Sequence, residues 1–190
     1  MFKAKLNRLL PILACFLLGQ IGSLDDPRNI ISLTVTKDGN FELDTPASWR
    51  QNLDVKFPNN LAIKDSKAGA YLTIQSILKA DVVSPSLESF DHSSYKEIIR
   101  NASSATPSKI ETFPTCAGKG RSLCRKVDAI VENYRLAYYY CSLDCADSYH
   151  QLIFWTMKSS FEKYSTDFID MAKSFRPANL PDITGIKPKK

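Results

Sequence analysis

Apolar and polar residues alternate through much of the second half of the chain, which is the pattern of half-buried β-strands. Strands are predicted at residues 109–117, 122–131, 134–143 and 149–158. The stretch "AGKGRS" at 117–122 contains two glycines, so it predicts a turn between the first two of these segments. We therefore expect three or four consecutive strands in this part of the chain.

Two earlier segments show the same two-residue period. Residues 34–52 read as a strand, a turn and a second strand, because Asp38-Gly39 is a hairpin dipeptide and Phe41 begins a new alternation that Pro46 ends. Residues 68–78, "AGAYLTIQSIL", place aliphatic side chains on one face and Tyr71 on the other.

Two segments instead repeat their apolar residues every three or four positions, which predicts amphipathic helices. The first stripe consists of Leu87, Phe90, Tyr95, Ile98, Ile99 and Ala102. The second consists of Phe161, Tyr164, Phe168, Met171 and Phe175. Ser159 and Glu162 match a capping box at the start of the second helix. Because each helix has one apolar stripe, each should cover the sheet on one side, giving an α+β fold with an antiparallel sheet flanked by helices.

The N-terminal segment has the form of an export signal, which we place at residues 1–23. Three cations precede an apolar run at 9–18, and small residues follow that run. The run is shorter than the roughly 20 residues that a spanning helix needs. A retained anchor and a lipid on Cys15 are the alternatives. The folded domain is expected at 30–177, followed by a tail rich in proline and lysine at 178–190.

The composition, 44% hydrophobic and 24% charged, is that of a folded protein. Removing Lys3, Lys5 and Arg8 with the signal leaves 22 basic residues against 20 acidic ones, a net charge of +2 in place of +5. Nucleic-acid binding requires a clustered basic face, so we expect no nucleic-acid partner.

Short motifs near both ends of the domain resemble the PsbP-like superfamily. They are "FELDTPASW" at 41–49, "YHQLIFWTM" at 149–157 and "FEKYSTDFIDMAKSFRP" at 161–177. The matching residues are Phe41, Pro46, Trp49, Tyr164, Phe168, Ser174 and Phe175. The resemblance covers most of 35–177 and implies an α/β/α sandwich without catalytic residues. The superfamily includes secreted bacterial proteins, lipoproteins and Ran-binding relatives, and its partners differ widely.

Four cysteines remain beside Cys15, namely Cys116, Cys124, Cys141 and Cys145, and they are not part of that pattern. An even number in an exported chain predicts two disulfides. Zinc is the alternative, but the first gap is C-x₇-C rather than a tight C-x₂₋₄-C knuckle, so no metal is expected.

Two pairings of these cysteines are open. A turn at the glycines would place Cys116 opposite Cys124 and leave Cys141 with Cys145. A two-residue turn at Glu132-Asn133 would place Cys124 opposite Cys141 and leave Cys116 with Cys145. The short loops of the first pairing favour it slightly.

Four tyrosines lie in "YRLAYYYCSLDC" at 134–145. In a strand, Tyr134, Tyr138 and Tyr140 share one face and Tyr139 lies on the other. An exposed aromatic surface of these four residues could bind a partner. Packing of the rings under a helix or across strands is the favoured interpretation, because strands are enriched in aromatic residues.

The chain has two histidines, His92 and His150, and neither lies in a metal-ligand spacing. No G-x-S-x-G elbow or phosphate-binding glycine loop is present, so no catalytic residue and no cofactor are expected. These observations favour a secreted or periplasmic, non-catalytic binding or assembly factor with a protein partner. The alternative is a membrane-tethered accessory protein of an envelope or transport complex, held by its N-terminus or by Cys15.

Overall fold

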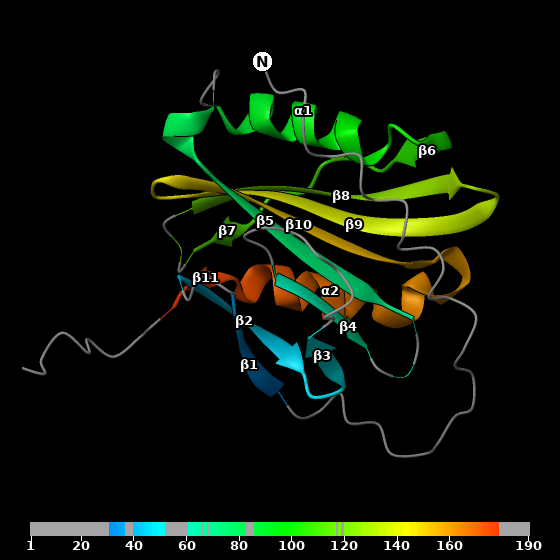
Figure 1. Ribbon diagram of the computed structural model, residues 1–190, viewed down its shortest axis with the longest axis horizontal. Helices are drawn as coiled ribbons and strands as arrows, with labels where there is room; N and C mark the ends of the chain where they lie inside the picture. The colour runs from blue at the N-terminus through cyan, green and yellow to red at the C-terminus, as the bar shows by residue number, and fades with distance from the viewer. Residues whose placement is uncertain are drawn as a thin grey trace, which may run out of the picture.

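The fold is a large antiparallel sheet with one helix on each face, so the expected α+β architecture is confirmed (Figure 1). The computed structural model describes residues 31–36, 40–51, 61–65, 67, 69–82, 86–116, 118 and 120–178. In Figure 1, helix α1 lies above the sheet and α2 below it, with β1 and β2 beyond α2.

The eight-stranded sheet has the order β3-β4-β5-β10-β9-β8-β6, with β7 also paired to β8. Its strands are β3 (Trp49–Gln51), β4 (Leu61–Asp65), β5 (Tyr71–Leu78), β6 (Ala102–Pro107), β7 (Pro114–Thr115), β8 (Gly120–Val131), β9 (Tyr134–Cys145) and β10 (Ser148–Met157). A smaller sheet of order β1-β2-β11 contains β1 (Ile31–Val35), β2 (Phe41–Pro46) and β11 (Arg176–Pro177). The helices are α1 (Leu87–Ile98) and α2 (Phe161–Ser174), with 3₁₀ turns η3 (Lys79–Asp81) and η4 (Lys158–Ser160).

The centre of the large sheet is the meander β8-β9-β10. Glu132 and Asn133 form the turn between β8 and β9, and both have positive φ angles, 48° and 70°. Two consecutive left-handed residues match the two-residue hairpin turn whose twist suits antiparallel strands. The ladder runs in register from Val131 opposite Tyr134 to Arg121 opposite Asp144, as the predicted turn requires.

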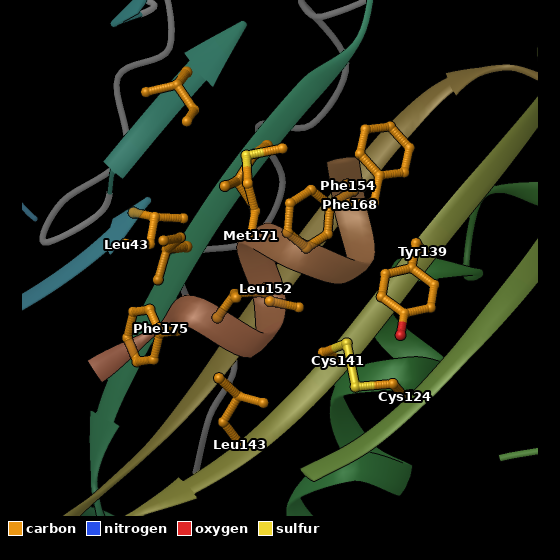
Figure 2. Close-up of a cluster of buried hydrophobic side chains, with 14 of the residues drawn as sticks. Leu43, Cys124, Tyr139, Cys141, Leu143, Leu152, Phe154, Phe168, Met171 and Phe175 are labelled. Atoms are coloured by element: carbon orange, nitrogen blue, oxygen red, sulfur yellow. A yellow bond between two sulfur atoms is a disulfide. The ribbon is translucent and has the colours of Figure 1, made fainter. Parts of the chain in front are cut away.

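The main core lies between α2 and the sheet (Figure 2). The apolar stripe predicted for α2 is buried, and Phe168 packs against Phe154 of β10 with ring centroids 5.1 Å apart. A second cluster lies on the α1 face, where Tyr71 stacks on Trp155 at 5.2 Å. Both faces of the central strands are therefore covered.

The motif residues from the two ends of the domain contact one another. Phe41 of β2 stacks on Phe175 at 5.2 Å, and Trp49 of β3 lies edge-on to Phe168 at 6.2 Å. The Ser174 hydroxyl accepts a hydrogen bond from the Asp44 amide at 3.0 Å. The motif at 41–49 and the motif at 161–177 thus pack against each other, which joins the beginning of the domain to its end.

Three local predictions are wrong. The described part of the predicted strand, residues 109–116, is not a continuous strand: within it only Pro114–Thr115 pairs as a strand, and Glu111 makes a single bridge. Ala102 begins β6 rather than continuing α1. The capping box at Ser159 is absent, because η4 places Ser159 within a 3₁₀ turn and Ser160 becomes the N-cap of α2.

Several predictions fall on residues outside the described part of the chain. These are the export signal at 1–23, the turn at Asp38-Gly39 and the tail beyond residue 178. Among the helices that are described, none has both the length and the apolar character needed to cross a bilayer.

Candidate functional site

The four cysteines form two nested disulfides, Cys124–Cys141 inside Cys116–Cys145. The pairing that the short loops favoured, Cys116 with Cys124 and Cys141 with Cys145, is therefore wrong. The register of the β8-β9 hairpin decides the matter, because it places Cys124 directly opposite Cys141.

The position of Cys124–Cys141 in the ladder explains why a disulfide fits there. The backbone N–H and C=O of Cys124 both bond Glu111, each at 2.8 Å, on the side away from β9. Cys124 and Cys141 are consequently a non-hydrogen-bonded pair, the type whose Cα atoms lie closest across antiparallel strands. Their Cα atoms are 4.1 Å apart, and both residues are fully buried under α2.

The four tyrosines do not form one surface. Tyr139 points into the α2 core and Tyr140 into the α1 cluster, and both are buried. Tyr138 is half-buried in the α1 cluster, and Tyr134 at the end of the hairpin is 37% exposed. This placement corrects the hypothesis of a shared aromatic binding surface and agrees with the packing interpretation. Burial raises the pKa of Tyr138, Tyr139 and Tyr140 to about 12.

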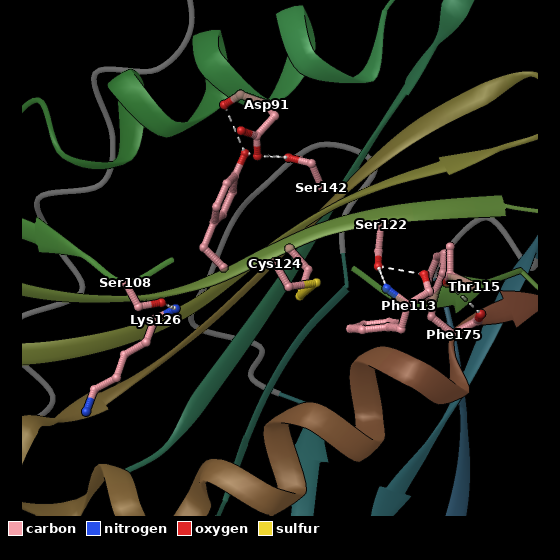
Figure 3. Close-up of a disulfide and its surroundings, with 11 residues drawn as sticks. Asp91, Ser108, Phe113, Thr115, Ser122, Cys124, Lys126, Ser142 and Phe175 are labelled. Carbon is pink, nitrogen blue, oxygen red and sulfur yellow. Dashed lines mark hydrogen bonds between the residues drawn. A yellow bond between two sulfur atoms is a disulfide. The ribbon is translucent and has the colours of Figure 1, made fainter. Parts of the chain in front are cut away.

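A buried polar network lies between α1 and the sheet (Figure 3). Asp91 of α1 pairs with Arg125 of β8, and both residues are at most 9% exposed. The other Asp91 carboxylate oxygen accepts a hydrogen bond from the Ser142 hydroxyl at 3.0 Å. The Tyr140 hydroxyl lies 2.7 Å from the Ser142 hydroxyl, and the Gln151 amide donates to it at 3.5 Å.

This network went unpredicted, although the sequence carries a signal for it. Asp91 lies four residues after Leu87 and four before Tyr95, so it occupies a position within the apolar stripe of α1. Arg125 likewise shares a strand face with Val127. The Arg125 guanidinium carbon lies 5.0 Å from the centre of the Tyr95 ring, within cation–π range. We expect this buried, hydrogen-bonded ion pair to fix how α1 sits on the strands, which a double-mutant cycle can test.

The two histidines occupy different environments. His92 is exposed on α1, whereas His150 of β10 is fully buried. The His150 Nδ1 atom lies 2.9 Å from the Ser76 hydroxyl, and its ring packs between Phe41 at 4.2 Å and Phe175 at 5.0 Å. The ring of half-buried Phe41 and the fully buried rings of His150 and Phe175 are called the ring trio below. The His150 ring is therefore fully buried against the two phenylalanine rings, whereas Ser76 is partly exposed.

Comparison with known proteins finds likeness at the level of structure alone, since no family model and no curated protein matches the chain. The solution structure of the cyanobacterial PsbP of Synechocystis, CyanoP, superposes with a TM-score of 0.59 and 11% identity, covering 84% of this chain and 98% of that one. The chain has the PsbP-like fold. The resemblance read from the end motifs is thereby confirmed for the fold.

Two further structures with the PsbP-like fold come from other settings. The Ran-binding protein Mog1p of Saccharomyces cerevisiae has a TM-score of 0.56 and 6% identity, covering 77% of this chain and 95% of its own. LpqN, involved in cell envelope biogenesis of Mycobacterium tuberculosis, has a TM-score of 0.54 and 10% identity, covering 78% and 91%. At such identities the shared PsbP-like fold does not carry a site from one protein to another.

Proposed function

We propose that the protein is exported and acts outside the reducing cytosol as a non-catalytic binding or assembly factor with a protein partner. The observation that carries this proposal is the pair of disulfides closed inside the domain core. Disulfides persist in oxidising compartments such as the periplasm and the extracellular space, and are rare in the cytosol.

The structural neighbours support this class of function. Mog1p is named for binding Ran, and LpqN for a role in cell envelope biogenesis. The polar pairs within the fold also support a structural rather than a catalytic role for their residues. The ion pair of Asp91 and Arg125 is buried between α1 and the sheet, and buried His150 contacts Ser76 of the neighbouring strand, so both pairs link elements of the fold.

The test is an intact mass measurement on protein isolated from its native source under non-reducing conditions. The proposal expects a chain that begins near residue 23 and lacks the four hydrogen atoms lost on forming two disulfides. Free thiols at Cys116, Cys124, Cys141 and Cys145, or a full-length chain in the cytosol, would contradict export. A diacylated Cys15 would establish the membrane-tethered alternative.

The binding role requires a second measurement. Chemical crosslinking in intact cells, followed by purification under denaturing conditions, should recover one partner protein in a constant ratio to this chain. A Tyr134→Ala variant, altered at the exposed end of the β8-β9 hairpin, tests whether that end of the hairpin contacts the partner. Catalytic turnover on a panel of small-molecule substrates would contradict the non-catalytic role.

A further inference from the structure

The outer disulfide, Cys116–Cys145, is connected through backbone contacts to the end of α2. The amide of Cys116 donates a hydrogen bond to the Phe175 carbonyl at 3.2 Å, and the Thr115 hydroxyl donates to the same oxygen at 3.5 Å. Phe175 is the C-cap residue of α2 and directly precedes β11 (Figure 3). The disulfide therefore anchors Thr115 and Cys116, the residues that bond the C-terminal end of α2.

Phe175 and the residues after it complete the small sheet. The Phe175 ring belongs to the ring trio, stacked on Phe41 and packed against His150. The Arg176 side chain donates hydrogen bonds to Glu42 at 2.8 Å and to Asp44 at 2.9 Å, which joins β11 to β2. Any loosening of the Phe175 backbone would thus reach the ring trio and the β2-β11 pairing together.

The two disulfides differ in how much structure must open before a reductant can reach the sulfur atoms. Cys124–Cys141 lies within two long strands, with ladder pairs on both sides and α2 packed against it. Cys116 instead lies in a turn after the two-residue strand β7, with a positive φ of 53°, and Cys145 is the last residue of β9. Turns and strand ends open locally at a smaller free energy than the centre of a sheet.

We propose that Cys116–Cys145 is a redox-sensitive clasp whose reduction by a dithiol releases the end of α2 and uncovers the ring trio, while Cys124–Cys141 stays intact. One thiolate of the dithiol attacks a sulfur of the pair and expels the other as a thiolate. The second thiol of the reductant then displaces the remaining cysteine and forms the reductant's own disulfide. Two electrons pass from the dithiol to the pair, and Cys116 and Cys145 each end as a protonated thiol.

The first test is graded reduction of the purified oxidised protein with dithiothreitol, with acid trapping, alkylation and peptide mass spectrometry. The clasp predicts that alkylated Cys116 and Cys145 accumulate while Cys124 and Cys141 remain linked. Simultaneous loss of both disulfides, or earlier reduction of Cys124–Cys141, would overturn the proposal.

The second test measures opening through the two histidines, using carbethoxylation by diethyl pyrocarbonate. In a Cys116→Ala/Cys145→Ala variant, modification of His150 should accelerate by at least about tenfold, the signature of a local opening. Exposed His92 should react at an unchanged rate and serves as the internal control. The matched variant, Cys124→Ala/Cys141→Ala, should leave His150 protected for as long as the outer disulfide is closed.

The reduced wild-type protein gives the same readout without substitutions. Selectively reduced protein in which His150 stays as unreactive as in the oxidised protein would contradict the clasp. Global unfolding of the Cys116→Ala/Cys145→Ala variant, seen as loss of the far-ultraviolet circular dichroism of the sheet, would also contradict it, because a clasp opens locally.

Discussion

Tyr139 and Tyr140 are neighbours in the chain, yet their hydroxyl groups have opposite surroundings. The Tyr140 hydroxyl lies within a network that includes Ser142 and Gln151. The buried Tyr139 hydroxyl has no hydrogen-bond partner among the residues that the structure describes. A buried polar group is favourable only when it is bonded, so the two hydroxyls should differ in their effect on stability.

We expect Tyr140→Phe to lower the free energy of unfolding by about 1–3 kcal/mol, because it leaves buried polar partners unpaired. Tyr139→Phe should change it by less than about 0.5 kcal/mol or raise it, since no bond is lost. Urea denaturation of both variants with the disulfides intact measures the difference. Equal losses in the two variants would show that the Tyr139 hydroxyl is bonded after all.

The ion pair of Asp91 and Arg125 gives a second prediction at this scale. Asp91→Ala should destabilise the domain by about 3–5 kcal/mol, because it leaves the Arg125 charge buried without compensation. The double variant Asp91→Leu/Arg125→Met should recover most of that loss, since apolar replacements of a buried pair are often neutral. A double-mutant cycle completed with Arg125→Met measures the coupling. Additive effects would mean that the pair does not fix α1 on the sheet.

At the scale of elements, Gly120 determines how closely the end of β8 approaches β9. A Cβ atom at Gly120 would lie 2.2 Å from the Asp144 carbonyl oxygen. That oxygen belongs to the backbone, so no side-chain rotation can relieve the clash. Only glycine therefore allows the strands to meet beside the outer disulfide.

Gly120→Ala should cost about 1–3 kcal/mol, the range for forced overpacking, and should weaken amide protection at Cys145. Gly118→Ala is the matched control. Gly118 has a φ of +81°, but a Cβ atom added there would meet nothing within 4 Å. Its substitution should therefore cost only about 1–2 kcal/mol of backbone strain and leave Cys145 protected. Hydrogen exchange distinguishes the two, and equal protection at Cys145 in both variants would contradict the steric argument.

The sequence predicted the three long strands well, because their alternation of apolar and polar residues is a local signal. The strands expected at 122–131 and 134–143 left Glu132-Asn133 as a possible two-residue turn, and that turn sets the register that places Cys124 opposite Cys141. The preference for short loops nevertheless favoured the other cysteine pairing, because loop length carries no information on register. The capping box failed because a serine and a glutamate three residues apart cannot reveal the 3₁₀ turn before α2. Asp91 was missed because a charged residue in a helix usually faces water, and its partner lies in a strand 34 residues away.

For the whole molecule, the buried tyrosines predict sensitivity to alkaline pH. Burial raises the pKa of Tyr138, Tyr139 and Tyr140 from 10 to about 12, because the charged phenolate is poorly solvated in the core. The unfolded chain loses these protons at lower pH than the folded one. Their contribution to stability is therefore complete below pH 10 and is lost as the pH rises from 10 to 12.

The free energy of unfolding should fall with pH across that window, and the phenolate absorbance of these three tyrosines should appear together with loss of the sheet signal. Tyr138→Phe removes one of the three phenols. It should lower by one the number of protons released on unfolding in this window, so the free energy of unfolding should fall less steeply with pH. Ionisation of all three tyrosines near pH 10 while the fold persists would contradict their burial.

The nesting of the two disulfides also bears on how the protein is made. Cys116 and Cys124 precede Cys141 and Cys145 in the chain, yet they are not partners. An oxidase that joined cysteines in the order of their emergence would trap a non-native bond, whose rearrangement proceeds by thiol exchange over seconds to hours. Correct maturation thus requires either that the β8-β9 hairpin form before oxidation or that the cysteines exchange partners afterwards, a step that an isomerase would accelerate.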